Sequence, residues 1–273
     1  MRMPRKLGGH LFRCNLRDSI SREVCFTGHY EPQETALVRS ILRPGMNFVD
    51  VGANWGYFTL LAASLVGEKG RILSLEPDPR LFPILDENVT RSGLDQVTAL
   101  QIAAGSEGGF LSLSGYDDKG DNFGVSRVVS NPNDHEHIYQ VNSDSLDNLL
   151  TRRRLDSVDL MKMDVEGAEF FAITGLERSL AAGRIKRLLL ELHPAQLAEH
   201  GIAAIALMQR LWQMGYSAWT IDHSFVATRR AAYNRFVDIR ELLHPLAPSE
   251  NLDAWPHHLW LAPGIELCPL IIG

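Results

Sequence analysis

The chain has 273 residues and a formal net charge of -6, with 45% hydrophobic and 22% charged residues. This composition is ordinary for a globular protein with a real apolar core, and the length suits one large domain or one domain with additions. The negative charge disfavours nucleic acid and anionic membranes as partners, because both prefer a basic surface.

The N-terminal ten residues are basic and lack the apolar core of a secretory signal. No run reaches the roughly 20 apolar residues of a membrane span. We therefore expect a soluble, cytoplasmic protein. Cys14, Cys25 and Cys268 are too few and too scattered for a disulfide framework or a zinc site. Cys14 and Cys25 would face each other across a hairpin, but reduced thiols are the expectation.

Residues 1–45 are interpreted as an N-terminal cover, of strands plus a helix, that packs on a main domain formed by residues 46–273. Two short extended pieces are predicted at residues 10–15 and 23–26, with a polar turn at residues 17–19. Pro32 suits the first turn of a helix that runs to about Leu42.

A glycine turn between an apolar run at residues 48–51 and a second one after residue 57 predicts a buried strand followed by a buried helix. Its spacing is not the G-x-G-x-x-G that places a pyrophosphate on a helix N-terminus. The acid ahead of the turn repels phosphate and favours a sulfonium or an α-ammonium group. The turn therefore predicts S-adenosylmethionine, and an ordinary strand-turn-helix is the alternative. The predicted contacts are Asp50, Gly52, Ala53, Asn54 and Gly56.

The next two strands, predicted at residues 71–75 and 96–102, supply further cofactor contacts. Glu76 follows Gly56 by 20 residues, the interval at which an acid reaches the ribose hydroxyls of a nucleoside. Capping of the following helix is the alternative reading of Glu76. Pro77 and Asp78 continue that turn, and Ala103 and Ala104 would leave a flat slot for an adenine ring.

Residues 110–142 depart from a simple alternation of strands and helices. Residues 110–114 and 137–141 alternate as strands do, and the polar loop between them contains the motif Asp-Asn-Phe-Gly at residues 121–124. We interpret the segment as a β-hairpin insertion with a mobile lid near the cofactor, and disorder without function is the alternative.

Acidic residues follow the fourth predicted strand, residues 158–164, after a short helix at residues 145–150. Asp164 lies where open α/β sheets bind ligands, outside the carboxyl end of a strand, so it is a candidate for both cofactor binding and catalysis. Glu166 and Glu169 begin the next helix, which is predicted to continue through Leu176. The helix dipole alone would explain these two acids.

The fifth predicted strand, residues 185–192, leads to a candidate base. Glu191 and His193 are two apart on an extended chain and therefore face the same side. His193 is expected to join Asp164, although a purely structural histidine is the alternative. A helix at residues 203–214 and strands at 216–221 and 258–261 complete the prediction, with residues 222–257 lying over the site.

Together these segments resemble the FkbM-type methyltransferase family over about residues 10–195. The resemblance implies an α/β, Rossmann-like class I methyltransferase fold: a central, mostly parallel, seven-stranded sheet with helices on both faces, an N-terminal extension and the hairpin insertion. It also implies S-adenosylmethionine as methyl donor and O-methylation of a hydroxyl on a sugar, glycan or secondary metabolite. The matching stretches are residues 28–34, 48–59, 75–79, 86–88, 103–105 and 161–169.

Methyl transfer is an in-line displacement that a base in hydrogen-bond reach of the acceptor hydroxyl assists. Our hypothesis is that His193 or Asp164 takes the proton, while Glu166, Glu169 and Glu191 orient the substrate. No residue is assigned to a metal, and a divalent cation held by these acids is the alternative. The rival functions are a nicotinamide-dependent oxidoreductase and a non-catalytic binding protein. The acceptor and the oligomeric state stay open.

Overall fold

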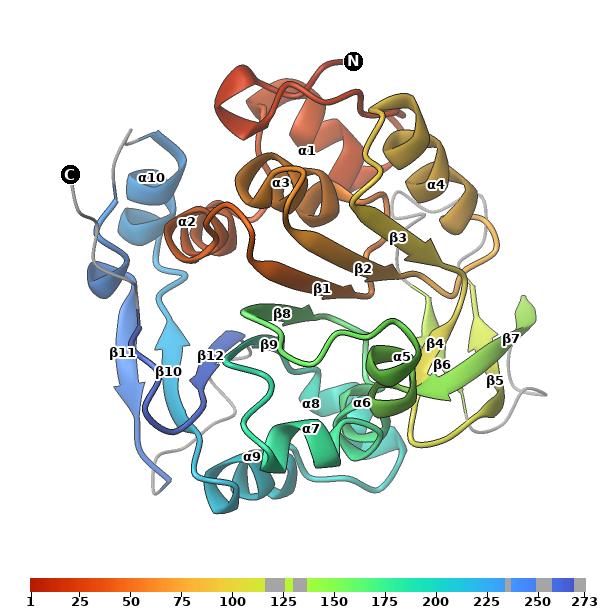
Figure 1. Cartoon of the computed structure of the whole chain (residues 1–273), viewed down its shortest axis with the longest axis vertical. Coiled ribbons are helices and arrows are strands. Elements are labelled where there is room, and N and C mark those ends of the chain that lie inside the picture. Colours follow the sequence, from red (N-terminus) through yellow and green to blue (C-terminus); the bar gives the residue numbers. More distant parts are fainter. Residues whose placement is uncertain (116–125, 130–136, 234–236, 249–256, 268–273) are drawn as a thin grey trace.

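An eight-stranded sheet forms the centre of the molecule, in the order β11-β10-β12-β9-β8-β1-β2-β3 (Figure 1). The computed structural model describes residues 1–115, 126–129, 137–233, 237–248 and 257–267. The strands are β1 (Asn47–Val51), β2 (Arg71–Leu75), β3 (Val97–Leu100), β8 (Leu160–Met163), β9 (Arg187–Glu191), β10 (Ser217–Ile221), β11 (Leu243–Leu246) and β12 (His257–Leu261).

Strands β3, β2, β1, β8 and β9 pair in parallel, whereas β12 lies antiparallel between β9 and β10. All seven predicted strands form, but the predicted number is wrong by one because β11 adds an antiparallel edge to β10. The segment Leu243–Leu246 is short and contains Pro245, which argues against a strand in sequence. An edge strand tolerates proline because one side of its backbone needs no partner.

Helices cover both faces of this sheet, as predicted (Figure 1). Side chains alternate along each strand, so Phe48 packs into one apolar core while Val49 and Val51 pack into the other. The first core is covered by α2 (Pro32–Ile41), α3 (Tyr57–Val66) and α4 (Phe82–Arg91). The second is covered by α5 (Leu146–Arg152), α6 (Glu169–Thr174), α7 (Glu177–Ala181), α8 (Pro194–Glu199) and α9 (Ala204–Gln213). Helix α10 (Phe225–Tyr233) packs beside α2.

The helix predicted to run from residue 164 through Leu176 forms, but it is shorter than predicted. Helix α6 begins only at Glu169 and ends before Gly175. A Cβ at Gly175 would lie 2.1 Å from the carbonyl oxygen of Gly105. The absence of a side chain at Gly175, the C-cap of α6, therefore lets the backbone of Gly105 approach closely.

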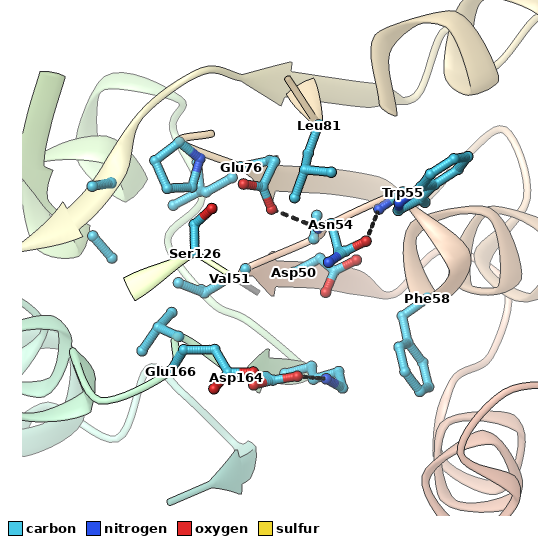
Figure 2. A pocket seen from close by; sticks show the side chains of 18 of the residues that line it. Asp50, Val51, Asn54, Trp55, Phe58, Glu76, Leu81, Ser126, Asp164 and Glu166 are labelled. Atoms are coloured by element: carbon cyan, nitrogen blue, oxygen red, sulfur yellow. Dashed lines mark hydrogen bonds and ion pairs between the residues drawn. The ribbon is translucent and has the colours of Figure 1, made fainter. Parts of the chain in front are cut away.

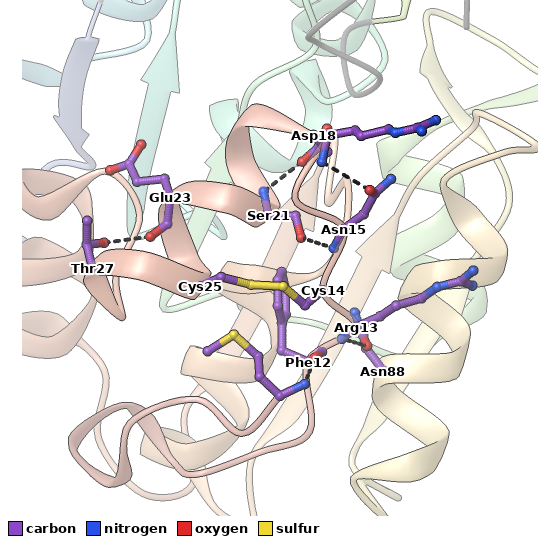
Figure 3. Close-up of a disulfide and its surroundings, with 12 residues drawn as sticks. Phe12, Arg13, Cys14, Asn15, Asp18, Ser21, Glu23, Cys25, Thr27 and Asn88 are labelled. Atoms are coloured by element: carbon purple, nitrogen blue, oxygen red, sulfur yellow. Dashed lines mark hydrogen bonds between the residues drawn. A yellow bond between two sulfur atoms is a disulfide. The ribbon is translucent and has the colours of Figure 1, made fainter.

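Of the two predicted extended pieces, the one at residues 10–15 includes an antiparallel bridge between Leu11 and Arg2, whereas the one at residues 23–26 is wrong. Residues Ser19–Thr27 are one helix, α1, whose N-cap is Asp18. The Asp18 carboxylate accepts a hydrogen bond of 2.7 Å from the backbone N–H of Ser21 (Figure 3). Such a cap stabilises a helix start, and here it outweighs the strand preference of the short apolar run at residues 24–26. Residues Met3, Leu7 and Phe12 share an apolar core with α3, while the division after residue 45 stays a prediction.

The prediction of reduced thiols at Cys14 and Cys25 is wrong, since a disulfide joins them (Figure 3). Their Cα atoms lie 6.7 Å apart. The missed helix explains the error, because α1 turns the chain back so that Cys25 faces residue 14. The disulfide anchors α1 to the preceding extended segment. The cytoplasmic location stays a prediction.

A second sheet, in the order β4-β7-β5-β6, extends the molecule beyond β3 (Figure 1). Its strands are β4 (Ala103–Gly105), β5 (Gly109–Ser114), β6 (Arg127–Val128) and β7 (Ile138–Ser145). Strands β5 and β7 pair antiparallel, which confirms the predicted hairpin. The Asp-Asn-Phe-Gly motif and most of the predicted lid lie outside the described residues. Among the helices that the structure describes, none combines the length and apolar character needed to cross a membrane.

Candidate active site

A cavity opens at the carboxyl ends of β1, β2 and β8, where an open α/β sheet binds its ligands (Figure 2). Helix α1 closes one side of it with Ser19, Ile20 and Glu23, and the second sheet contributes Leu113 and Val128. Most of the predicted cofactor contacts line the cavity, namely Asp50, Gly52, Ala53, Asn54, Glu76, Pro77, Ala103, Ala104 and Asp164.

Gly52 brings β1 and β8 together at the floor of the cavity. Its φ is +82°, and a Cβ there would lie 1.8 Å from the carbonyl oxygen of Asp164. Only glycine fits this close approach. Gly56, in contrast, is not among the residues that line the cavity. It has a φ of +85° and packs against Leu85 of α4, so its role is to allow the turn conformation and the close packing of α4.

Two buried carboxylates, Asp50 and Glu76, frame the glycine turn (Figure 2). Asp50 accepts a hydrogen bond of 2.7 Å from the Thr59 hydroxyl, and burial raises the pKa of Asp50. Glu76 accepts hydrogen bonds from the backbone N–H groups of Asn54 (2.7 Å) and Asp78 (2.9 Å). Burial raises the pKa of Glu76 to about 8. A carboxylate has further lone pairs, so Glu76 keeps the capacity to accept from a ligand hydroxyl.

The side chain of Asp78, a predicted cofactor contact, has a structural role instead. It does not line the cavity and binds Arg80 at 2.7 Å and the hydroxyl of Ser126. Burial raises its pKa, but the hydrogen bonds from Arg80 and Ser126 outweigh burial and lower it. Asp78 thereby ties the end of β2 to the insertion that supplies Ser126.

A cluster of acids surrounds His193 beside the cavity. The Nδ1 atom of His193 lies 2.7 Å from Oε1 of Glu169. Its Nε2 atom lies 3.3 Å from Glu166, 3.7 Å from Glu191 and 4.0 Å from Asp164. All five predicted catalytic residues are therefore together. Asp164 and Glu166 also line the cavity, whereas His193, Glu169 and Glu191 are not among its lining residues.

Burial and neighbouring charges shift the pKa values of this cluster. Burial lowers the pKa of His193, but the hydrogen bond to Glu169 and the surrounding carboxylates outweigh burial and raise it to about 9. Burial and the neighbouring charge of Asp164 raise the pKa of Glu191 to about 9. Burial also raises the pKa of Asp164, but Lys162 and His193 more than compensate and lower it. In the ligand-free protein His193 is therefore a positively charged imidazolium, protonated on both ring nitrogens, at neutral pH.

Lys162 and Glu31 belong to the site and are absent from the sequence predictions. The Lys162 ammonium lies 3.1 Å from Asp164, 3.7 Å from Glu31 and 4.8 Å from the centre of the Phe58 ring. Burial lowers the pKa of Lys162, but the nearby carboxylates, Asp164 first, raise it well above its ordinary value. A lysine between two methionines in a central strand was the signal that could have identified it.

Three members of the cluster also suit a cation. One ligand atom each from Asp164, Glu191 and His193 lies within 4.8 Å of the others. Carboxylate oxygens and an imidazole nitrogen are donors for several divalent metals. The structure therefore keeps the cation alternative open at the same place as the proposed base.

Comparison with known proteins gives the family. The methyltransferase FkbM domain matches residues 50–218, which is more than half of the chain. The 2-O-methyltransferase NoeI of Sinorhizobium fredii is 27% identical over 159 residues, or 54% of this chain and 64% of that protein. A protein-L-isoaspartate O-methyltransferase of Triticum aestivum is 43% identical over 56 residues, or 20% of this chain and 24% of that protein. The chain thus spans less than two thirds of each relative.

Among solved structures, a SAM-dependent O-methyltransferase from Thermotoga maritima aligns over 87% of this chain and 68% of its own, with 14% identity and a TM-score of 0.42. The central sheet is mostly parallel and the cavity lies at the switch between β1 and β8, as the predicted Rossmann-like fold requires. The chain belongs to the FkbM family of S-adenosylmethionine-dependent methyltransferases.

Proposed function

We propose that the protein transfers a methyl group to a hydroxyl oxygen of a sugar, a glycan or a secondary metabolite. The observation that carries this proposal is the junction of the cavity with the His193 cluster, which meet at Asp164 and Glu166. The similarity to NoeI, a 2-O-methyltransferase, supports a hydroxyl acceptor.

The cavity suits a cationic methyl donor. S-adenosylmethionine supplies an electrophilic methyl group on a positively charged sulfur. Atom Oδ1 of Asp164 is buried and accepts no hydrogen bond from any described residue. This oxygen would therefore attract the positive charge, while Asp50 and the turn at residues 52–54 would hold the methionine part. Glu76 would accept hydrogen bonds from the ribose hydroxyls, and Ala103 and Ala104 would border the adenine.

His193 is the proposed general base. Glu169 accepts a hydrogen bond from Nδ1, which directs Nε2 of His193 toward Glu166, Glu191 and Asp164. An imidazole that is oriented by a buried carboxylate on one nitrogen presents the other to the substrate. A pKa of about 9 opposes this role in the ligand-free protein. A cation bound beside Asp164 and Glu166 would offset their charge and lower the pKa of His193 toward neutrality.

A divalent cation on Asp164, Glu191 and His193 is the alternative, in which the acceptor hydroxyl loses its proton because its pKa is lowered by the metal. The two variants are separated by a methylation assay with labelled donor. Activity that survives a chelator contradicts the metal mechanism. Full activity in His193→Ala contradicts both mechanisms, because His193 is the base in one and a metal ligand in the other. If His193 is the base, we expect His193→Ala to lower kcat by about 10²- to 10⁴-fold with an unchanged donor Kd.

Two rival functions are tested by binding and turnover. Calorimetry with S-adenosylmethionine and with NAD distinguishes the methyltransferase from a nicotinamide-dependent oxidoreductase. Donor binding without any methylated product, in a cell extract incubated with isotope-labelled donor, would instead support a non-catalytic binding protein. The same experiment, read by mass spectrometry, identifies the acceptor.

A further inference from the structure

Three residues that are far apart in the chain, Glu34, His223 and His257, come together at the end of the sheet near α2. Glu34 lies in the first turn of α2, His223 follows β10, and His257 begins β12. None of them lines the cofactor cavity or was predicted to act in the methyl transfer.

The pairing of the strands explains why the two histidines meet. Strand β12 is antiparallel to β10, with His258 opposite Thr220. The start of β12 therefore lies beside the end of β10, two residues before His223. The side chain of Gln33 holds this loop against α2, because its amide donates to the carbonyl oxygen of Asp222 (3.1 Å) and to the hydroxyl of Thr228 (2.7 Å).

The donor atoms have the spacing of a metal site. Oε1 of Glu34 lies 2.8 Å from Nε2 of His223 and 3.3 Å from Nδ1 of His257. The two imidazole rings stack, with centres 4.0 Å apart. One ligand atom from each residue lies within 4.8 Å of the others. Ligands that each bind one ion at about 2.0–2.2 Å need separations of this order.

Burial and access also fit an ion. The Glu34 side chain is 2% exposed, and its second oxygen, Oε2, is buried without a hydrogen-bond partner in the part of the chain that the structure describes. Leaving a carboxylate oxygen in this state is unfavourable, and a cation would compensate it. The His223 side chain is 35% exposed, which gives an ion a route from solvent.

We propose that Glu34, His223 and His257 bind a divalent transition-metal ion of the Zn²⁺ class, at a site separate from the methyl-transfer cluster. Two imidazoles and one carboxylate are typical donors for such ions and leave positions for water. The other nitrogen of His257 lies 3.7 Å from Glu191, the kind of outer carboxylate that orients a metal-binding histidine. The ion would thus connect α2 to β10 and β12, next to Glu191 of the His193 cluster.

The test is calorimetric titration of the chelator-treated full chain with Zn²⁺ alone. All proteins carry His193→Ala, which removes one ligand from the competing group around Asp164. His223→Ala is compared in that background with His244→Ala, a matched control. His244 lies on the neighbouring β11, is 60% exposed and approaches Asp222 at 3.8 Å, outside the proposed site.

We expect the background protein to bind one Zn²⁺, His223→Ala to weaken binding at least about tenfold, and His244→Ala to leave it unchanged. Glu34→Gln should weaken binding as well while keeping the shape of the side chain. Visible absorption of bound Co²⁺ provides a second readout, which should be lost in His223→Ala. Equal Zn²⁺ affinity in the His223 and His244 variants, or no binding by the background protein, would overturn the proposal.

Discussion

Gly52 is the residue at which two neighbouring strands come closest. Two features each require glycine at position 52, namely the positive φ and the close contact with the Asp164 carbonyl. Substitution of a second glycine that has only the first feature separates their costs. Gly45 has nearly the same φ, +85°, but a Cβ there would meet no atom within 4 Å. The pair therefore isolates the cost of the steric contact from the cost of the backbone conformation.

We predict that Gly45→Ala costs about 1–3 kcal/mol of the free energy of unfolding, because only the backbone is strained. Gly52→Ala should cost clearly more and also abolish donor binding, since β1 and β8 must separate. Urea denaturation and calorimetry with S-adenosylmethionine measure the two effects. Equal destabilisation by both substitutions would contradict the role assigned to the Asp164 contact.

The protonation of His193 predicts a pH dependence of stability. Its pKa rises from an ordinary 6.5 to about 9 on folding, so the folded state holds the proton more tightly. This contribution, on the order of 3 kcal/mol, is complete below pH 6.5 and is lost as the pH rises through about 9. The raised pKa of Glu191 acts in the same direction.

We therefore expect the ligand-free protein to lose stability between pH 6.5 and 9.5 and the His193→Gln variant to lose less. Denaturant unfolding at both pH values gives the comparison. A variant with the same loss as the wild type would show that His193 does not hold the proton.

Helix α1, which the disulfide anchors, forms one wall of the cofactor cavity. Replacing both Cys14 and Cys25 by serine opens a loop of sequence separation 11, which we expect to cost about 3 kcal/mol. Because Ser19 and Ile20 line the cavity, donor affinity should fall too. Hydrogen exchange of the α1 amides and donor titration measure these effects. Reductant should weaken the wild type similarly and leave the double variant unchanged, and any reductant effect on the latter would indicate another target.

Secondary structure was predictable where a local pattern agreed with the packing. The apolar runs of β1 and α3 and the alternation of β5 and β7 carried enough signal. Helix α1 was missed because its signal is a cap at Asp18 rather than a long periodic pattern, and the disulfide was missed with it. Strand β11 was missed because it is short and contains Pro245, which is tolerated only because β11 lies at the edge of the sheet.

The site was predictable where it follows the ends of the strands. Asp50, Glu76, Asp164 and His193 follow from that rule. The pairing of Asp78 with Arg80 and Ser126 depends on a contact with the insertion, which no local pattern shows. Similarly, Glu34, His223 and His257 meet only through strand order, and their spacing in sequence resembles no metal motif.

At the scale of the whole molecule, ligand binding should stabilise the fold, since the cavity is lined by both sheets and by α1. S-adenosylmethionine at 100 times its Kd should add about 2.7 kcal/mol to the free energy of unfolding. Thermal denaturation with and without the donor measures this, with NAD as the control. A shift with NAD and none with the donor would contradict the assigned cofactor.

The position of β12 between β9 and β10 has a consequence for synthesis on the ribosome. A nascent chain that has not yet released residue 261 cannot fill this gap, so β9 and β10 each keep an open hydrogen-bonding edge. Such edges recruit other chains, and molecular chaperones act on intermediates of this kind. Strands β10 and β11 can therefore join the five parallel strands only after β12 has formed.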